Sequence, residues 1–404
     1  MSELEQQEEQ EVMQTTEPIK DVDVKEILES TKLNKVDQEI LRMTPVDLTG
    51  SNVNEKIKQL YTEFSSFLET SADILPDSGV KQVIPTGIDI LDAILGGGLA
   101  LGTMSMFIGP PGCGKSMMAA QIAGSMQLKF PGSIVAYLDS EEAVTTLRLY
   151  NLGVKNPPLK PYADITTEKV FKFLEGLCLF KEHKKIIDVP SIVVWDSISN
   201  TLSQKERETD DVNSVIGYKA RVLSILIPKY VAKLSKFNIH LLTVNQLRDL
   251  IQIGNFIPAK EMKFMPAGKD IPGGNVLKFN TFQLLYIKVK SVLDPKKEGF
   301  SGIAVEINCV KNKLFTPNIL IEVVGNFLTG FSNFHTNYRF LVTNKRLTTG
   351  AWNYLVDLPN KKFRTVDVES LYKTDLIFKE TFDKAVKETI QRELIEKNTI
   401  QVET

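Results

Sequence analysis

GPPGCGKS, residues 109–116, matches the pattern G-x-x-x-x-G-K-[ST] of a phosphate-binding loop. The apolar run 104–108 leads into it and predicts a buried strand, and a helix is expected to open at Ser116. Glycines let the backbone wrap a polyphosphate, while amides of the loop and of the helix start point at it. Lys115 is expected to reach the β- and γ-phosphates, and the Ser116 hydroxyl to bind Mg²⁺. The pattern therefore predicts a nucleoside triphosphatase.

The composition of the chain limits its fold class, its partners and its cellular compartment. The 404 residues are 43% hydrophobic and 24% charged, which suits a globular protein. The formal net charge is −2, so a polyanion site must come from local clusters. Three scattered cysteines favour a reducing compartment, and Cys113 is interpreted as a small filler and not as a redox centre. Without a signal segment or a long apolar run, we expect a cytoplasmic protein and no membrane partner.

The chain is predicted to have four parts. Residues 1–20 are rich in Glu and Gln and are interpreted as a disordered acidic tail, which is either solubilising or a mimic of nucleic acid. Residues 21–80 show helical spacing and predict a small helical N-terminal element. An α/β core is expected over 81–330, and a mixed, small α+β C-terminal region over 331–404. In the last part, a helix near 381–396 has Ala385, Ile390 and Leu394 as its buried stripe.

Short apolar runs alternate with helical patterns from about Val83, which is typical of an α/β fold with a mostly parallel central sheet. Buried strands are expected at 133–139, 191–196 and 239–246. A short helix before the phosphate loop is expected to be capped and started by Thr86 and Asp89, and to end at Gly96–Gly98.

Polar side chains follow these strands. Ser140-Glu141-Glu142 comes after the first strand, Asp196 ends the second and Asn245-Gln246 ends the third. Ligands of open α/β sheets bind beyond the carboxyl ends of the strands, so we expect these side chains near the phosphates. Asp196 is the expected partner of Mg²⁺, and an amide at the end of the third strand can sense a γ-phosphate or orient a water.

Two polar segments and two lysines leave alternatives open. Residues 203–215 predict a mobile loop before a helix over 217–237. Residues 247–274 interleave Lys and Arg with apolar side chains, which suits single-stranded nucleic acid or an ordinary surface insertion. Lys311 and Lys313 follow a strand that starts at Ile303 and point to one side, and taken alone they are interpreted as solvated edge lysines.

The order of these motifs resembles the RecA family of DNA recombinases over residues 84–317. The resemblance is carried by the following stretches: Pro85-Thr-Gly-Ile-Asp-Ile-Leu-Asp, Leu138-Asp-Ser-Glu141, Asp196-Ser197, Asn245-Gln246-Leu-Arg248, Gly273-Gly-Asn-Val-Leu-Lys-Phe279 and Lys311-Asn-Lys313. Fainter similarity in Gly350-Ala-Trp352, Phe363-Arg364 and Phe382-Asp-Lys-Ala385 favours the T4-type phage branch. Lys311-Asn-Lys313 resembles the bacterial proteins instead. Phage coding would place the protein in the host cytoplasm.

The resemblance implies a RecA-like P-loop ATPase core with ATP and Mg²⁺ as cofactors. Glu141 corresponds to the residue that activates the attacking water, with Glu142 as the alternative. Gln246 corresponds to the γ-phosphate sensor, and Lys311 and Lys313 to the pair that reaches into a neighbouring subunit's ATP. Where the family commonly stacks a Tyr on adenine, this chain has Arg148. The implied nucleotide contacts are Gly109, Pro110, Pro111, Gly112, Cys113, Gly114, Lys115, Ser116, Met117 and Arg148, with Ser116 and Asp196 at the metal.

The implied partners are single-stranded DNA, homologous duplex DNA and further copies of the chain in a helical filament, with a single-strand-binding protein and a loader as additional candidates. The helical element 21–80 would serve oligomerisation. The implied DNA contacts are Arg221, Arg248, Ile251, Ile253, Gly273, Gly274 and Asn275; a core-packing role for the isoleucines stays open. The alternatives are a hexameric helicase of the same fold, another DNA-stimulated ATPase, or a mediator in which ATP only gates assembly.

Overall fold

The computed structural model describes residues 82–142, 144–155, 158, 164–249, 263–295 and 299–399. They belong to one compact unit, Val80–Thr404. The predicted acidic tail and helical element, together with Ile251 and Ile253, lie outside the described residues.

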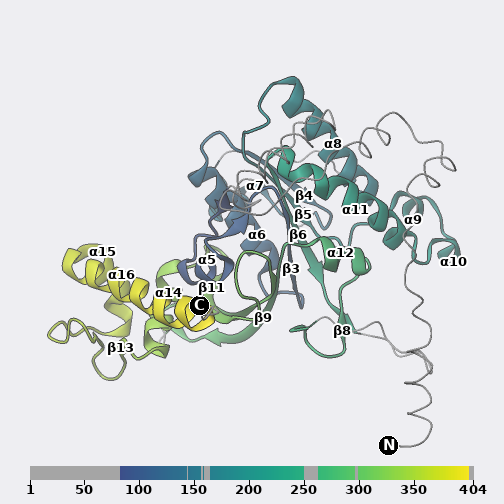
Figure 1. Ribbon diagram of the computed structural model, residues 1–404. Helices are drawn as coiled ribbons and strands as arrows, with labels where there is room; N and C mark the ends of the chain where they lie inside the picture. Colours follow the sequence, from purple (N-terminus) through teal and green to yellow (C-terminus); the bar gives the residue numbers. More distant parts are fainter. Residues whose placement is uncertain are drawn as a thin grey trace, which may run out of the picture. The chain divides into compact units, whose positions relative to one another are not determined.

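The described part of the chain is built on a central sheet of eight strands in the order β12-β11-β10-β9-β3-β6-β5-β4 (Figure 1). Pairing is parallel from β9 through β3, β6 and β5 to β4, and antiparallel from β9 through β10 and β11 to β12. The predicted α/β core with a mostly parallel central sheet is confirmed. The strands are β3 (Met104–Gly109), β4 (Ile134–Asp139), β5 (Ser191–Asp196), β6 (Ile239–Gln246), β9 (Gln283–Leu293), β10 (Gly302–Asn312), β11 (Leu320–Asn326) and β12 (Gly330–Phe331).

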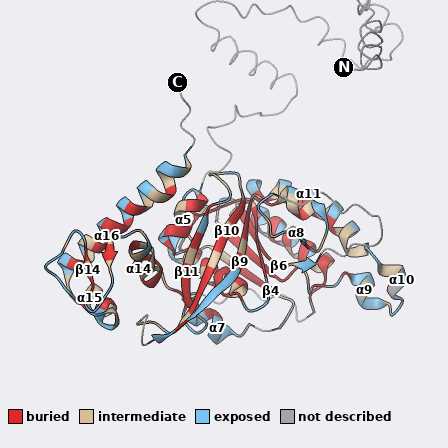
Figure 2. Cartoon of the chain, turned by 90° about the horizontal axis from the view of Figure 1, so that it is seen from below, coloured by how far each residue is buried: buried red, intermediate tan, exposed pale blue. Residues whose placement is uncertain are grey.

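Helices cover both faces of this sheet (Figures 1 and 2). Successive residues of a strand point to opposite faces, so Phe107 joins the apolar cluster under α5 and α6, while Met106 joins the cluster under α8, α11 and α12. Strands buried on both faces are rich in apolar residues, and β3, β5 and β6 are buried along almost their whole length. The helices of the core are α5 (Asp89–Leu95), α6 (Lys115–Lys129), α7 (Thr146–Asn151), α8 (Thr167–His183), α11 (Tyr218–Lys236) and α12 (Asn275–Asn280).

Two local expectations were wrong. Helix α5 begins at Asp89 and has Gly96 as its C-cap, as predicted. Thr86 does not cap the helix, because its hydroxyl accepts a hydrogen bond from the Ile88 amide. The N-cap is Ile88, which makes no side-chain capping bond. The expected loop 203–215 contains two short helices, α9 (Gln204–Glu208) and α10 (Val212–Val215). Ser203 and Glu206 form a capping box at α9, which satisfies the free amides of that helix start.

Short strand pairs flank the core. They are β1 (Val83–Ile84) with β2 (Leu99–Ala100), β7 (Arg248–Asp249) with β8 (Lys269–Asp270), and β13 (Leu347–Thr348) with β14 (Tyr354–Leu355). The pair β7 and β8 closes the ends of the segment that was expected over 247–274.

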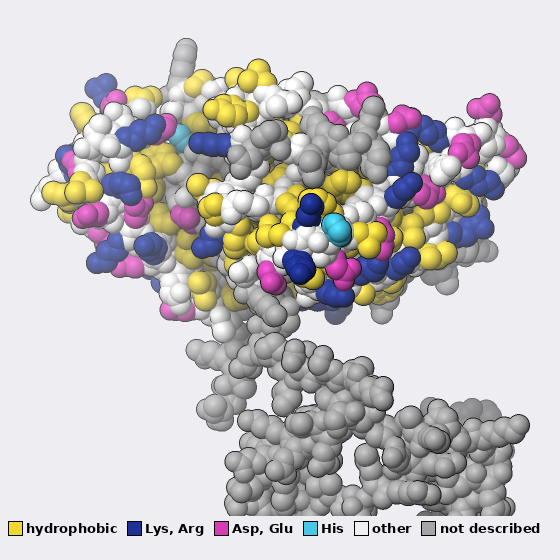
Figure 3. Space-filling view, turned by 90° about the horizontal axis from the view of Figure 1, so that it is seen from above, with side chains coloured by type: hydrophobic (Ala, Val, Ile, Leu, Met, Phe, Trp, Pro, Cys, Tyr) yellow, Lys and Arg dark blue, Asp and Glu magenta, His cyan; other side chains and the backbone are white. Residues whose placement is uncertain are grey.

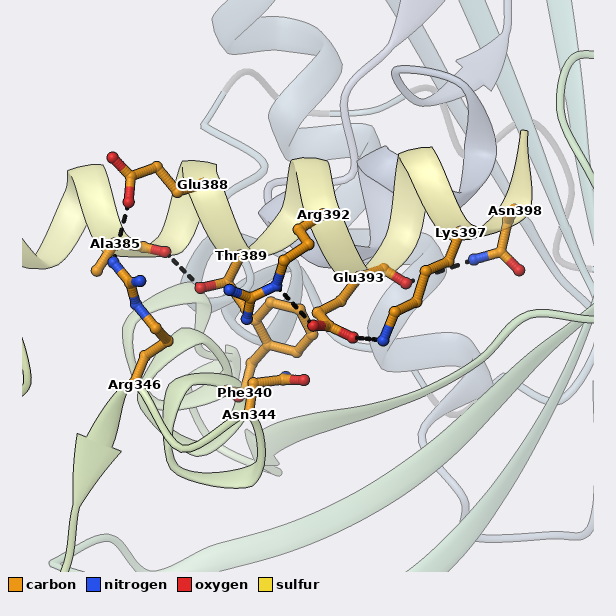
Figure 4. Close-up of polar contacts among 10 residues, drawn as sticks. All are labelled: Phe340, Asn344, Arg346, Ala385, Glu388, Thr389, Arg392, Glu393, Lys397 and Asn398. Carbon is orange, nitrogen blue, oxygen red and sulfur yellow. Dashed lines mark hydrogen bonds and ion pairs between the residues drawn. The ribbon is translucent and has the colours of Figure 1, made fainter. Parts of the chain in front are cut away.

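The C-terminal region packs its own apolar cluster from α14 (Asn333–Thr343), the β13–β14 pair, α15 (Val368–Thr374) and α16 (Leu376–Ile390), and the 3₁₀ turn η1 (Thr365–Asp367) leads into α15. The chain continues as a π turn η2 (Gln391–Ile395) and a 3₁₀ turn η3 (Glu396–Asn398). The predicted stripe is confirmed, because Ala385 lies in the C-terminal cluster, Leu394 lies in the core cluster and Ile390 contacts both. Figure 4 shows the polar contacts along this segment, including the Arg346–Glu388 ion pair at 2.9 Å.

Among the helices of the described residues, none combines the length and the apolar character that a membrane crossing requires.

Candidate nucleotide site

The phosphate-binding loop adopts conformations that require glycine. Gly109 has φ of 155°, and a Cβ there would lie 2.0 Å from the carbonyl oxygen of Ile287 on β9. Gly114 has φ of 92°, and a Cβ there would lie 2.9 Å from the ring of Phe331. Gly114 is also the N-cap of α6, so the first amides of that helix face the space above the loop. The backbone of this turn therefore presents amides to an anion.

Lys115 brings a positive charge under the same turn. Its ammonium donates hydrogen bonds to the carbonyl oxygens of Gly109 at 3.0 Å and Pro110 at 2.7 Å, and the residue is only 7% exposed. Carbonyls stabilise a buried ammonium partially, so a polyphosphate that displaces them gains a charge-assisted bond. Cys113 packs beneath the loop with no exposed surface, and burial raises the pKa of its thiol, as a small filler requires.

Asp196 ends β5 directly beside Ser116. Its carboxylate accepts hydrogen bonds from the Ser116 hydroxyl and from the Tyr137 hydroxyl, the latter at 2.9 Å. Burial raises the pKa of Asp196 to about 6; the two hydrogen bonds oppose this, and the nearby carboxylates of Glu141 and Asp139 add to it. A hard cation would relieve this excess of negative charge.

The donor set fits Mg²⁺. Among the described residues no cluster of three or more His, Cys, Asp or Glu side chains forms a metal cage. Mg²⁺ is usually bound by one or two protein oxygens, with substrate phosphates and water completing its shell. Ser116 and Asp196 supply such a pair of protein oxygens.

Glu141 sits at the turn after β4. Its Oε1 accepts hydrogen bonds from the Ser197 hydroxyl at 3.1 Å and from the Asn200 amide at 2.5 Å. Ser140 fastens this turn to β5, because its amide donates to the Asp196 carbonyl at 2.7 Å. Strands β4 and β5 are parallel neighbours, so their acids meet at one edge of the sheet.

These residues line one pocket of about 190 Å³. Of the predicted site residues it gathers Pro111, Gly112, Gly114, Lys115, Ser116, Met117, Glu141, Arg148, Asp196 and Gln246. The lining does not include Gly109, Pro110 and Cys113. These residues contact the Lys115 ammonium instead, Gly109 and Pro110 through their carbonyl oxygens and Cys113 through its sulfur. Of the two neighbouring acids, Glu141 lines the pocket and Glu142 does not. The structure therefore brings together ten predicted residues from four segments of the chain.

Three lining residues were not predicted: Ser197, Val244 and Phe327. Phe327 is 44% exposed and lies in the turn between β11 and β12. The pairing of β12 with β11 and the hydrogen bonds of Gln121 to Phe331 hold this turn beside α6. The glycines Gly325 and Gly330 mark a turn in the sequence, but nothing local relates that turn to the phosphate loop.

The comparisons with known proteins agree with this geometry. The family model of the RecA N-terminal domain matches residues 55–332. The chain belongs to the RecA family. Protein RecA of Herpetosiphon aurantiacus is 30% identical over 279 residues, which are 68% of this chain and 72% of that protein. Protein RecA of Thermus thermophilus is 29% identical over 264 residues (65% and 71%), and that of a Wolbachia pipientis strain is 32% identical over 238 residues (58% and 61%).

Lys311 and Lys313 lie outside the pocket. Lys311 is half-buried in β10, and its ammonium donates to the carbonyl oxygens of Lys278 at 2.8 Å and Phe279 at 2.9 Å near the end of α12. Burial lowers the pKa of Lys311 to about 8, and the charge of Lys313 contributes. Lys313 is exposed, just past the strand end, with its ammonium 5.6 Å from the ring centroid of Phe282. The interpretation of Lys311 as a solvated edge lysine was wrong, because β10 is an inner strand and Lys311 caps a helix end.

The predicted DNA contacts fall into two groups. Arg221 on α11 and Arg248 on β7 are exposed. Gly273 and Gly274 have φ of 104° and 88° and lead into Asn275, the first residue of α12. The Asn245 amide donates to the Pro272 carbonyl at 2.9 Å, so the end of β6 is tied to the end of the segment 247–274.

Proposed function

We propose that this RecA-family protein is an ATP-dependent DNA recombinase that forms a helical filament on single-stranded DNA and catalyses homologous pairing and strand exchange. The observation that carries the proposal is the position of Gln246. It lines the nucleotide pocket, and two residues later Arg248 begins the segment proposed to bind DNA. A change at the γ-phosphate thus reaches the DNA segment through one peptide strand.

Hydrolysis of ATP to ADP and phosphate is assigned to the pocket. The oxygen of a water attacks the γ-phosphorus, the bond to the β-γ bridging oxygen breaks, and Glu141 takes the proton of the water. Lys115 and the amides of the loop stabilise the charge that develops on the phosphate oxygens. Mg²⁺, when held by Ser116 and Asp196, supplies further positive charge at the β- and γ-phosphates. Gln246 senses the γ-phosphate.

The second part of the site comes from another copy of the chain. Lys311 and Lys313 do not line the pocket of their own chain. We assign them to the nucleotide of an adjacent protomer, where they take the role that an arginine finger plays in other phosphoryl-transfer enzymes. Residues 21–80 are assigned to the contact between protomers.

DNA binding is assigned to Arg221, Arg248, Ile251, Ile253 and residues 273–275. Basic side chains are interleaved with acidic ones on the face that Figure 3 shows, so no single-sign field covers that face. With a net charge of −2, binding must rest on such local contacts to the DNA backbone, while base pairing reads the sequence.

The base of the nucleotide is assigned to the space between Arg148 and Phe327. A guanidinium plane and an aromatic ring both stack on purines, which compensates for the missing Tyr of the family pattern. Assignment to the T4-type branch rests on the C-terminal stretches. There Phe363, Phe382 and Ala385 are buried, and Trp352 is 52% exposed with the Arg364 guanidinium 5.4 Å from its ring centroid. A single-strand-binding protein and a loader are the proposed additional partners.

The deciding experiment measures ATP hydrolysis with and without single-stranded DNA, and then strand exchange between a circular single strand and a homologous linear duplex. We expect DNA to stimulate hydrolysis and exchange to occur, with both activities lost in Lys115→Ala. Stimulated hydrolysis with unwinding of a forked duplex and no exchange would identify a helicase instead. Hydrolysis that ignores DNA would contradict both functions.

A further inference from the structure

The carboxylate of Glu141 is held by two side chains from the segment that follows β5. Its Oε1 accepts one hydrogen bond from Ser197, which lines the pocket, and one from Asn200, which is exposed and does not line it. A carboxylate oxygen has two lone pairs, so both acceptor positions of Oε1 are used. Asn200 therefore fixes the orientation of the carboxylate through one of its two oxygens.

The segment that carries Asn200 is fixed at both ends. The Ser197 carbonyl accepts from the amide and the hydroxyl of Thr201 at 3.2 and 2.8 Å, and the Leu202 carbonyl accepts from the Thr167 amide at 2.9 Å. Between them, the Lys219 ammonium donates to the carbonyl oxygens of Ile198 at 2.5 Å and Ser199 at 3.2 Å. The Lys219 ammonium is thus the side-chain donor from α11 that binds the part of the segment next to Asn200.

Lys219 belongs to the side of the molecule that is proposed to bind DNA. It lies in the first turn of α11, two residues before Arg221. Burial lowers the pKa of Lys219 to about 8; the charge of Arg248 adds to this effect and that of Glu206 opposes it. Lys219 is half-buried, its ammonium is bound to the segment 198–200, and it lies close enough to Arg248 for that charge to affect its pKa.

We propose that Asn200 and Lys219 form a restraint that keeps Glu141 from its catalytic position until DNA binds; this inference rests on the proposed function. A DNA phosphate held near Arg221 and Arg248 offers Lys219 a charged acceptor in place of two neutral carbonyls. Once Lys219 leaves them, the segment 198–200 relaxes, Asn200 releases Oε1, and the carboxylate turns toward the attacking water. DNA stimulation of hydrolysis is the release of this restraint.

The opposite role is that Asn200 holds Glu141 in its productive orientation. The two roles predict opposite signs. For Asn200→Ala and for Asn200→Leu, which is close to Asn in size and adds no charge, we expect the DNA-independent kcat for ATP to rise about fivefold or more, a typical allosteric coupling, while KM for ATP stays at the wild-type value. The factor by which DNA stimulates hydrolysis falls correspondingly. Asn200→Leu keeps the size of the side chain and loses the donor, so a merely space-filling role would leave it at the wild-type rate.

The matched control is Asn344→Ala. It also removes a side-chain amide bond to a carbonyl oxygen, that of Phe340 at 2.8 Å, but in the C-terminal region (Figure 4). We expect wild-type hydrolysis from it with and without DNA. Thermal unfolding of every variant shows whether the fold is intact.

Lys219 gives the second, independent arm. Lys219→Met keeps the apolar stem and loses the donors, so it is expected to raise DNA-independent hydrolysis as the Asn200 variants do. Lys219→Arg keeps the donors and is expected to stay near the wild-type rate. Because both residues act through one contact on Glu141, the double variant Asn200→Ala/Lys219→Met should be no faster without DNA than the faster single variant.

The outcomes distinguish a failure of the proposed function from a failure of the proposed restraint on Glu141. Wild-type hydrolysis that DNA does not stimulate would overturn the proposed function. If DNA stimulates the wild type and the Asn200 variants are unchanged, or slower both with and without DNA, the restraint is refuted while the proposed function stands.

Discussion

Lys115 and Lys311 make the same kind of bond at two different places. Each ammonium donates to two backbone carbonyl oxygens: Lys115 to Gly109 and Pro110 within its own loop, and Lys311 to Lys278 and Phe279 at the end of α12. Lys115 lines the nucleotide pocket with Ser116, Glu141 and Asp196, and Lys311 does not. Two cations proposed to bind ATP phosphates, Lys115 those of its own chain and Lys311 those of a neighbour, thus lie in separate parts of one chain.

The different positions of Lys115 and Lys311 indicate how the catalytic groups would be divided between two protomers. The pocket of Lys115 is assembled by neighbouring parallel strands, so a single chain can bind nucleotide there. The surroundings of Lys311, at the end of α12, carry a positive charge, but the residues described there form no phosphate-binding turn. In the proposed function, Lys311 acts on a phosphate only where a second copy presents its pocket, which would couple hydrolysis to assembly.

The largest effect is expected from Lys115→Ala. It removes the charge inside the pocket and should lower kcat for ATP hydrolysis by about a hundredfold or more, as the loss of a preorganised charge does. Radiometric or coupled-enzyme assays measure the rate, and a fluorescent nucleotide measures binding. Normal hydrolysis in this variant would contradict the assignment of the pocket.

Lys311→Ala is expected to lower hydrolysis in the assembled protein by about a hundredfold and to leave nucleotide binding by the isolated chain unchanged. Mixing it with Lys115→Ala should restore part of the rate, because a Lys115→Ala protomer can offer its intact Lys311 to the intact pocket of its neighbour. If no ratio of the two variants hydrolyses ATP, the site is contained in one chain.

Gly109→Ala tests whether the phosphate-binding loop needs a residue without a side chain where it passes β9. Its Cβ would lie 2.0 Å from the Ile287 carbonyl oxygen, so we expect the free energy of unfolding to fall by about 3 kcal/mol. Gly112→Ala is the matched control: nothing lies within 4 Å of its Cβ, and only the cost of φ at 71° remains, about 1 kcal/mol. Denaturant unfolding of both variants measures the difference; equal losses would mean that the contact with β9 is unimportant.

The smallest expected effect is the pH dependence that the charge of Lys311 gives to the rate of ATP hydrolysis. Its pKa of about 8 means that the charged form is lost as pH rises through 8, so hydrolysis should fall by up to about tenfold per pH unit above that value. In Lys311→Arg the cation persists, and the decline should move to higher pH. Titration of Lys311 does not itself destabilise the fold in this range: its folded-state pKa lies below the ordinary 10.5, so its contribution to stability rises between pH 8 and 10.5. A rate–pH profile that is identical for both proteins would remove Lys311 from the reaction.

Local signals in the sequence were sufficient for much of the fold. The phosphate loop, the buried strands and α6 follow from glycine positions and apolar runs, and β3, β5 and β6 lie where those runs predict them. The helix α9 was missed although Ser203-Gln-Lys-Glu206 carries the capping-box pattern. Its polar composition concealed that signal, so this error concerns interpretation and not missing information.

The parts that escaped the sequence are contacts between distant segments. Phe327 joins the pocket because β12 pairs with β11 beside α6, and Asn200 bonds Glu141 across 59 residues of chain. No pattern within either segment specifies its partner.

By itself, the sequence determined the conformation of the phosphate loop, the α/β class and the polar residues at the strand ends, because backbone dihedral angles and hydrophobic periodicity depend on near neighbours. Only the tertiary structure decided that Lys311 caps α12, that Phe327 faces the pocket and that Asn200 holds Glu141. These arrangements depend on the order of strands in the sheet and on which face each helix covers, and that order is set by the packing of the whole core.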